Sequence, residues 1–385
     1  MSEIKELIER LCPDGVEYKK LGEVLEYEQP SKYIVSSKDY IDEGIPVLTA
    51  GQTFILGYTD ENTGIYRASK EKPVIIFDDF TTSFHWVTFD FKVKSSAMKM
   101  LRPINDDIVF RFIYYAMKCI KYETADHARQ WISKYSLFEI PVPPIEVQRK
   151  IVEILDNFTE LEAELEAELE ARRKQYEYYR DNLFRTSTNI KKIGDLTKVF
   201  SCPRVFRNQW KESGIPFWRS SDVMSYHNGV KNPRGEVFIS QSLYQELSRK
   251  TEKIEKGDLL VTGGGSIGMP YLKRDNNPLF VKDADLICIK KCDNFIPSFL
   301  YHYFFTTEFR TYLKKITHDA TIAHYTINQI KDTPIPVPPI EEQKRIVAIL
   351  DRFEALTTDL QSGLPAEIEA RRKQYEYYRE KLLTF

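Results

Sequence analysis

The stretch IPVPPIEVQRKIVEILDNF at residues 140–158 returns as IPVPPIEEQKRIVAILDRF at residues 335–353. The run ARRKQYEYYR at residues 171–180 likewise returns unchanged at residues 370–379. The segments that lie outside these repeats do not match each other. A chain that duplicates such stretches while the segments between them diverge is typical of a scaffold that carries two different domains.

Each repeat predicts a long helix. The proline-rich residues 141–144 cannot be helical and lead into a helix that starts near Glu146. From Ile151 to Leu183 the apolar residues recur at spacings of three and four, which places them on one face. At about 1.5 Å per residue, a helix of roughly 38 residues is about 57 Å long, a length typical of a coiled-coil partner. In the second repeat, Gly363 and Pro365 predict a break or kink.

The first repeat is four residues shorter than the second, and its sequence LEAE at residues 161–164 recurs at residues 165–168. One added unit of four residues lengthens a helix by about 6 Å and turns whatever follows by roughly 40°. That rotation is close to the roughly 36° per base pair of B-DNA, although the added length exceeds one base-pair step. The length of this helix is therefore predicted to act as an adjustable ruler.

The two segments outside the repeats begin alike, with KLGEV at residues 20–24 and KIGDL at residues 192–196. Both carry short β-type runs, followed by helical stretches around residues 108–122 and 297–315. We predict an α+β fold with two globular domains separated by two long antiparallel helices that form a coiled coil. The predicted parts are an N-terminal helix and first domain at residues 1–145, a central long helix at 146–188, a second domain at 189–338 and a C-terminal long helix at 339–385.

The composition limits the classes of protein to consider. With 385 residues, of which 42% are hydrophobic, the chain has ample material for domain cores. Its five cysteines form no Cys-x-x-Cys pair, so neither a disulfide framework nor a zinc site is expected. The first residues are charged and no apolar run approaches about 20 residues, which favours a cytoplasmic protein without membrane contact.

The charge is distributed unevenly along the chain. Residues 146–170 carry nine acids and two bases, whereas residues 189–250 carry eleven Lys or Arg and five acids. The first of these segments repels phosphate and the second attracts it.

Both variable segments contain side chains suited to DNA, which is read by groups that reach base edges and held by cations on phosphates. The sequence TTSFHW at residues 81–86 places hydroxyls, an imidazole and aromatic rings between two strands, and residues 204–220 interleave cations with indoles. The predicted DNA contacts are Gln52, Thr53, Arg67, Lys70, Thr82, Ser83, His85 and Trp86 in the first segment, and Arg204, Arg207, Lys211, Trp218, Arg219, Ser220, Gly264, Ser266, His324 and Tyr325 in the second.

Each repeat ends in three tyrosines within four residues, more than one coiled-coil stripe requires. We expect Tyr176, Tyr179, Tyr375 and Tyr378 to bind a partner subunit.

Two unlike segments alternating with two near-identical helices, preceded by LCPDGVEY at residues 11–18, resemble the specificity subunit of a type I restriction-modification enzyme over the whole chain. The resemblance implies that each variable segment is a target recognition domain that reads one half of a bipartite site in double-stranded DNA. It also implies that the paired helices set the spacing and dock two methyltransferase subunits, and that restriction/translocase subunits join them. S-adenosylmethionine, ATP and Mg are then expected in the partner subunits, and this chain is expected to be non-catalytic, without a cofactor or metal of its own.

Two alternatives remain open. The sequence GGGSIG at residues 263–268 fits Gly-x-Gly-x-x-Gly, a weak pattern for a nucleotide or S-adenosylmethionine loop. Because MPYL at residues 269–272 returns to strand-like residues, a tight turn between two strands is favoured, one that would let the backbone approach DNA. The chain has neither an Asn-Pro-Pro-aromatic nor a Gly-Lys-Ser/Thr motif, which argues against an autonomous enzyme. The second alternative is a coiled-coil adaptor whose domains bind proteins, and it predicts no affinity for duplex DNA.

Overall fold

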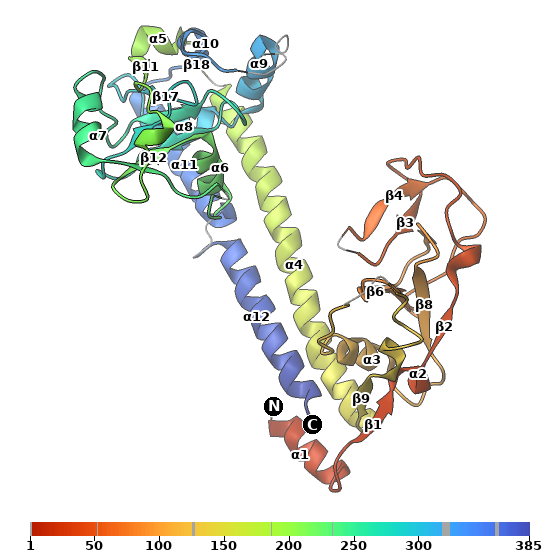
Figure 1. Cartoon of the computed structure of the whole chain (residues 1–385). Coiled ribbons are helices and arrows are strands. Elements are labelled where there is room, and N and C mark those ends of the chain that lie inside the picture. The colour runs from red at the N-terminus through yellow and green to blue at the C-terminus, as the bar shows by residue number, and fades with distance from the viewer. Residues whose placement is uncertain are drawn as a thin grey trace. The chain divides into compact units, whose positions relative to one another are not determined.

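The computed structural model describes residues 2–51, 53–124, 128–185, 187–232, 234–317, 324–358 and 362–385. The chain divides into two compact units (Figure 1). The first unit comprises Met1–Glu164 and Glu369–Phe385, and the second comprises Leu165–Ile368. No helix in the described ranges is both long enough and apolar enough to cross a membrane.

The globular part of the first unit is built on one four-stranded and one three-stranded sheet. The strand orders are β2-β8-β5-β6 and β4-β3-β7, and β1 pairs with β9 at the junction with the long helix. Within the three-stranded sheet, β3 runs parallel to β7. The elements are α1 (Ser2–Leu11), β1 (Glu17–Lys20), α2 (Leu21–Val24), β2 (Leu25–Glu28), β3 (Ile45–Leu48), β4 (Ile55–Thr59), β5 (Val74–Asp78), β6 (Phe84–Val87), β7 (Lys92–Val93), β8 (Met98–Pro103), α3 (Phe110–Met117) and β9 (Glu139–Val142).

The globular part of the second unit repeats this plan strand for strand. Its sheets have the orders β11-β17-β14-β15 and β13-β12-β16, β12 runs parallel to β16, and β10 pairs with β18. The elements are β10 (Ile190–Lys192), α5 (Ile193–Leu196), β11 (Val199–Ser201), β12 (Ile215–Trp218), α6 (Ser220–His227), β13 (Phe238–Ile239), α7 (Gln241–Ser248), β14 (Leu259–Thr262), β15 (Pro270–Leu272), β16 (Phe280–Val281), β17 (Leu286–Ile289), α8 (Pro297–Tyr303), α9 (Thr307–Thr317), α10 (Ile327–Asp332) and β18 (Pro334–Pro336). The predicted α+β plan for both domains is confirmed.

The central strand β5 is buried on both faces. Because successive side chains of a strand point to opposite faces, Ile75 and Phe77 join the core that includes α3, while Val74 and Ile76 join a second core. In the second unit β14 divides its side chains in the same way. The four-stranded sheet of each unit therefore lies between two apolar layers.

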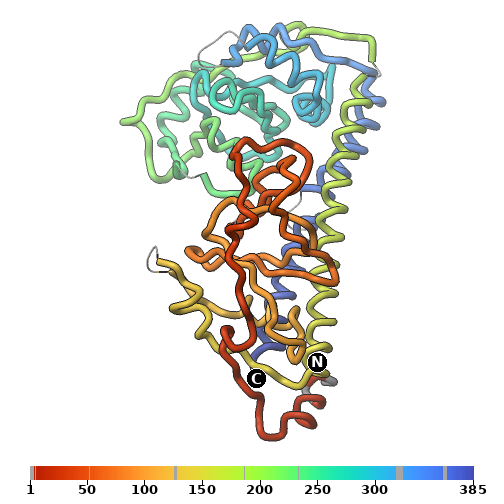
Figure 2. Tube along the Cα trace, turned by 90° about the vertical axis from the view of Figure 1, so that its right-hand side faces the viewer, coloured from red at the N-terminus to blue at the C-terminus, as the bar shows by residue number. Residues whose placement is uncertain are grey.

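The long helices are α4 (Ile145–Phe184), α11 (Ile340–Thr358) and α12 (Leu364–Leu383). With 40 residues, α4 is about 60 Å long and passes from one unit into the other without interruption (Figure 2). The second repeat is broken, as predicted from Gly363 and Pro365, and α12 starts afresh with Pro365 in its first turn. Proline is favoured there because the first N–H groups of a helix have no acceptor within it.

The two repeats pack against each other reciprocally. In the first unit, Phe158 of α4 stacks on Tyr378 of α12, with ring centroids 5.4 Å apart. In the second unit, Phe353 of α11 stacks on Tyr179 of α4 at 5.6 Å, and these residues are the repeat counterparts of Phe158 and Tyr378. Glu162 pairs with Arg372 at 2.6 Å, so α12 runs antiparallel to α4. In Figure 1, α11 also runs against the direction of α4.

Candidate nucleic-acid interface

In the first unit the predicted contacts Thr82 and Ser83 lie on the hairpin loop between β5 and β6. The loop begins at Asp79, whose N–H donates to the carbonyl of Ala97 (2.9 Å) and whose carbonyl accepts from the N–H of Gln130 (2.7 Å). Thr82 has a φ of 59°, in the left-handed region that few non-glycine residues adopt. The N–H of Thr82 donates to the carbonyl of Asp78 (2.9 Å), so backbone hydrogen bonds hold the loop both at its base and near its tip.

A buried ion pair anchors the same loop. Nζ of Lys99 lies 3.2 Å from Oδ2 of Asp79, and both side chains are 1% exposed. The pair has the distance of an ion pair without the angles of a hydrogen bond. Oδ1 of Asp79 accepts from the backbone N–H of Trp131 at 2.8 Å. Removal of Asp79 would leave the buried Lys99 without its carboxylate, which is strongly destabilising, whereas Asp79 has a second, more distant cation in Arg129 at 3.9 Å.

In the second unit the corresponding loop, residues 263–269, joins β14 to β15. The N–H of Gly263 donates to the carbonyl of Asp285 (2.7 Å), and its carbonyl accepts from the N–H of Tyr325 (2.9 Å). A Cβ atom on Gly263 would lie 2.6 Å from the carbonyl oxygen of Ala284, so this position requires glycine. The glycine-rich motif is thus a turn between two strands, as favoured from the sequence, and the nucleotide-loop alternative is wrong.

The two hairpin loops are anchored in the same way. Asp79 follows β5 and Gly263 follows β14. The N–H of each donates to the residue just before the neighbouring strand, β8 or β17, and the carbonyl of each accepts from a residue later in the chain. The predicted contacts Thr82 and Ser83 therefore correspond in position to the loop that carries Gly264 and Ser266. Different sequence patterns led to the same structural feature in both units.

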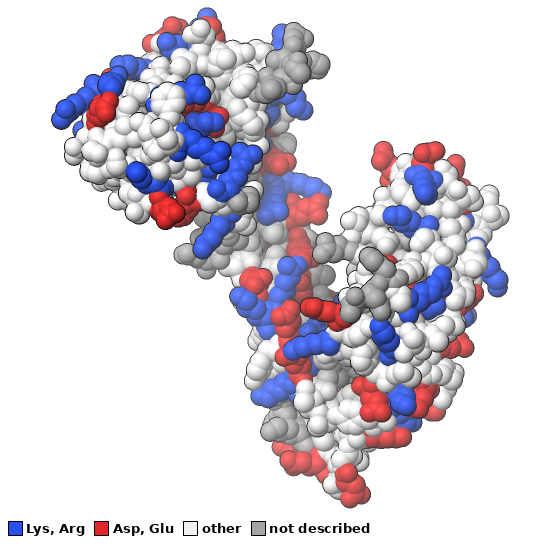
Figure 3. Space-filling model, viewed as in Figure 1, with Lys and Arg blue, Asp and Glu red and all other residues white. Residues whose placement is uncertain are grey.

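An open cavity of about 840 Å³ lies beside the loop of the second unit. The structure brings together on its wall five predicted contacts and several polar residues that the sequence did not single out. The predicted residues are Arg207, Arg219, Ser220, Gly264 and Ser266, and the others include Asn232, Arg234 and Lys282. Lys and Arg, blue in Figure 3, form several clusters on the visible face of this unit. A concave surface lined by cations and hydrogen-bonding groups suits the polyanionic backbone of DNA.

Two of the lining residues also fix the cavity wall. Arg219 is 8% exposed, and its guanidinium donates to Oδ2 of Asp222 (3.0 Å) and to the carbonyl of Gly235 (2.6 Å). The hydroxyl of Ser220 donates to the carbonyl of Asp285 (3.2 Å). The Ser220 bond connects the start of α6 to the base of the hairpin loop, and Arg219 connects it to the segment that follows α6, so both side chains position the wall.

The side chain of His324 lies beside the hairpin loop of the second unit, whereas that of Tyr325 points into the core. Nδ1 of His324 is 3.8 Å from where a Cβ on Gly264 would lie, and the residue is exposed. Tyr325, by contrast, is fully buried, and its hydroxyl hydrogen bonds to that of Thr333. The prediction that the side chain of Tyr325 contacts DNA is wrong, because it belongs to the core of the second unit.

The other predicted contacts of the second unit fall into two groups. Arg204, Arg207 and Lys211 are exposed on the segment that leads to β12. Trp218 packs on Tyr271, with ring centroids 4.6 Å apart, and this contact gives it a role in the core.

In the first unit, Thr53, Arg67 and Lys70 are exposed, and Gln52 lies outside the described residues. The guanidinium of Arg67 pairs with Asp90.

The two predicted contacts on β6 differ in their surroundings. The ring of His85 stacks on Phe54 at 4.5 Å, its Nε2 lies 3.1 Å from the carbonyl oxygen of Gly51, and burial lowers its pKa. Trp86 packs on Phe110 and Tyr114, so its indole faces α3 and serves packing.

The four tyrosines predicted to bind partners make contacts within the chain. Tyr179 and Tyr378 form the reciprocal stacks between the helices. The hydroxyl of Tyr176 lies 3.2 Å from Nδ1 of His302, while burial raises the pKa of Tyr375 to about 12. In the same runs Tyr178 and Tyr377 are 67% and 56% exposed, respectively. These two residues are better placed to bind a partner. They lie on the helix face opposite the apolar stripe, a position that could have been recognised from the sequence.

Comparison with known proteins gives consistent matches along the chain. A family model described as the type I restriction modification DNA specificity domain matches residues 13–171 and 187–370. The specificity subunit of the Escherichia coli type I restriction enzyme EcoR124I/EcoR124II is 39% identical over 100% of this chain and 98% of its own length. A putative type I restriction enzyme specificity subunit of Haemophilus influenzae is 32% identical over 96% of each.

Two solved structures share the fold. The S subunit of a type I restriction-modification system from M. genitalium has a TM-score of 0.54 and 15% identity, with 96% of this chain and 97% of that chain covered. A chain from a study of complex assembly and conformational transition of the type I system has a TM-score of 0.58 and 17% identity, with 96% and 98% covered.

Proposed function

The chain belongs to the type I restriction-modification DNA specificity family, as a non-catalytic recognition subunit, and we propose that each unit reads one half of a bipartite site in double-stranded DNA. The observation that carries this proposal is the duplicated strand order with equally anchored but unlike hairpin loops. The loop of the first unit reads FTTS at residues 80–83, whereas that of the second reads GGSIGM at residues 264–269. Two copies of one frame with different loops suit two different half-sites.

The chemistry of reading is supplied by the loops and the cavity. Ser and Thr hydroxyls serve as donors or acceptors toward several bases, and Arg pairs bidentately with guanine. Ser83 would act in the first unit, where the side chain of Thr82 is instead buried with its hydroxyl bonded to the carbonyl of Thr81, and Ser266, Arg207 and His324 would act in the second. The glycines at 264 and 265 add no side chain between the backbone and a base edge.

The long helices would dock the partners. We propose two methyltransferase subunits on the repeated helices and restriction subunits joined to them, with S-adenosylmethionine, ATP and Mg held by those subunits. Support comes from relatives named as parts of type I restriction enzymes and from the fold shared with a chain studied for complex assembly of such a system. The exposed Tyr178 and Tyr377 occupy equivalent positions for two equivalent partners. Action on cellular DNA would require the complex to be in the cytoplasm.

The gap between the half-sites would be set by α4. This helix is the uninterrupted connection between the units, and the LEAE repeat at residues 161–168 lies at the division between them. A change of one four-residue unit alters the length of the connection by about 6 Å and its rotation by roughly 40°.

Binding of the chain and its methyltransferase partner to pools of random duplex DNA, measured at two salt concentrations, tests the proposal. We expect selection of one bipartite sequence and a steep loss of affinity at the higher salt concentration. Binding without sequence selection would contradict the proposal. Affinity only for proteins would instead support the coiled-coil adaptor.

A further inference from the structure

One lysine in each unit occupies the same position in the frame. In the first unit β7 runs parallel to β3, and Lys94, which follows β7, donates its N–H to the carbonyl of Leu48 (3.0 Å). In the second unit β16 runs parallel to β12, and Lys282 donates its N–H to the carbonyl of Trp218 (2.9 Å). The paired strands match residue for residue, so the two lysines correspond.

Both lysines lie on the segment that supports a recognition hairpin. Three residues after Lys94, the carbonyl of Ala97 accepts from the N–H of Asp79. Three residues after Lys282, the carbonyl of Asp285 accepts from the N–H of Gly263. Each lysine is therefore three residues from a backbone hydrogen bond to the loop proposed to read bases.

Both ammonium groups are accessible. Lys94 is exposed, and within the described ranges it forms no ion pair. The side chain of Lys282 is 41% exposed on the wall of the cavity, and its Nζ lies 3.0 Å from Oδ2 of Asp285. Exposed pairs of this kind are weak, so a phosphate oxygen can replace the carboxylate.

The residues around the two lysines are not alike. The segment reads KVKSSAM at residues 92–98 and FVKDADL at residues 280–286, so only the Val-Lys pair is shared. The cations of the cavity wall, such as Arg207 and Arg234, belong to the second unit alone. A residue kept at one position in two units with unlike loops suits a task that is the same for both half-sites. Contact with the DNA backbone is such a task, because every sequence presents the same phosphates.

We propose that Lys94 and Lys282 are matched phosphate anchors, one for each half-site, that hold the DNA in register without reading its sequence. The proposal rests on the proposed function and adds two residues to it. As a compact ammonium group on a flexible stem, lysine binds phosphate as a point charge.

The test uses the complete complex with Lys94→Met, Lys282→Met and the double variant. Salt dependence of binding is measured for the selected site and for a scrambled duplex. We expect the slope of log affinity against log salt to fall by about 0.9 for each lost phosphate contact, equally for both DNAs. Asp285 already screens Lys282, so the shift for Lys282→Met is expected to be the smaller of the two. The selected sequence should not change.

Lys72→Met and Lys256→Met are the matched controls, because these exposed lysines lie just before β5 and β14, at the ends of the strands away from the hairpins. They should leave the slope unchanged, and Lys94→Arg and Lys282→Arg should retain it. Circular dichroism and thermal unfolding show whether each variant is folded. An unchanged slope in folded Met variants, or a loss confined to the selected site, would overturn the proposal. Absence of selection by the unaltered complex would instead overturn the proposed function.

Discussion

His302 in the second unit occupies the position that Tyr115 holds in the first. Nε2 of His302 lies 2.8 Å from Oδ1 of Asp351, and the hydroxyl of Tyr115 donates to Oδ1 of Asp156 at 2.5 Å. Asp156 and Asp351 are counterparts in the two repeats. In each unit the globular part is thus bonded to the equivalent aspartate of the long helix, but through a different side chain. The repeats therefore provide one common attachment point for two unlike domains.

Replacement of these two side chains is expected to have unequal effects. His302→Ala removes a fully buried ring that also contacts Tyr176, and it should reduce the free energy of unfolding by about 2–4 kcal/mol. Tyr115→Phe removes one hydrogen bond while Arg111 continues to pair with Asp156, so a loss of about 1 kcal/mol is expected. Urea unfolding of each variant measures both values. Equal effects would contradict the loss of packing expected when the whole His302 ring is removed.

A buried glutamine makes the same clamp in both units. Oε1 of Gln148 accepts from the N–H of Val109 before α3, and Oε1 of Gln343 accepts from that of Ile296 before α8. Gln148→Ala and Gln343→Ala leave these donors unpaired, so each should destabilise its unit by about 1–3 kcal/mol. The exposed Gln241 serves as the control, and Gln241→Ala should change the urea midpoint little. A similar shift in all three variants would refute the clamp.

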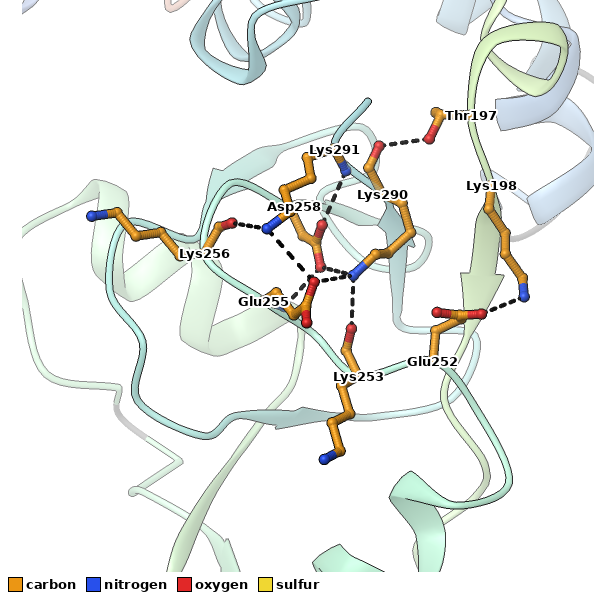
Figure 4. Close-up of polar contacts among 9 residues, drawn as sticks. All are labelled: Thr197, Lys198, Glu252, Lys253, Glu255, Lys256, Asp258, Lys290 and Lys291. Atoms are coloured by element: carbon orange, nitrogen blue, oxygen red, sulfur yellow. Dashed lines mark hydrogen bonds and ion pairs between the residues drawn. The ribbon is translucent and has the colours of Figure 1, made fainter. Parts of the chain in front are cut away.

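Asp258 organises the edge of the second unit that Figure 4 shows. Its fully buried carboxylate accepts from Nζ of Lys290 (2.8 Å) and from the backbone N–H groups of Lys291 (3.0 Å) and Glu255 (2.7 Å). Asp258→Asn removes the charge and should cost about 2–4 kcal/mol of stability. Glu255→Gln changes an exposed partner of the same lysine and should cost less than about 1 kcal/mol. The order of the two effects in thermal unfolding checks the assignment.

Burial of His227 predicts a dependence of stability on pH. Burial lowers the pKa of His227 below its ordinary value of 6.5, while its Nε2 is held by the carbonyl of Pro270 (2.7 Å). Because the unfolded chain then binds a proton more readily than the folded chain, this contribution to stability is present above about pH 6.5 and is lost as the pH falls. Between about pH 7.5 and about pH 5.5, the melting temperature of His227→Gln should therefore fall less than that of the unaltered chain. Parallel decreases would contradict the prediction.

The helices were predictable because their determinants are local. Glycine and proline at residues 363–365 interrupt the helical repeat independently of how the globular domains pack. The predicted helix at residues 297–315 is instead two helices, α8 and α9, because Thr306 caps the second by accepting from the N–H of Phe309 (3.2 Å). A threonine before a charged turn is a recognisable cap, so this break could have been foreseen.

The candidate site was predictable only in part. Hydroxyls, cations and glycines between strand-like runs predicted the positions of the two hairpin loops, as the strands β5, β6, β14 and β15 confirm. Burial could not be predicted for Tyr325, because its ring fills a core formed by distant segments and its hydroxyl bonds to Thr333, which lies beyond α10. The correspondence of Lys94 and Lys282 could be recognised only from the pairing of β3 with β7 and of β12 with β16, which cannot be read from the sequence alone.

The most direct test of the account is sequencing of methylated adenines in cells that carry the complex with either the unaltered chain or a variant lacking residues 165–168. The account predicts that the unaltered chain directs methylation to a bipartite site. It further predicts that the variant keeps both half-sites and changes only the gap between them. Altered bases in either half-site, or an unaltered gap in an active variant, would contradict it.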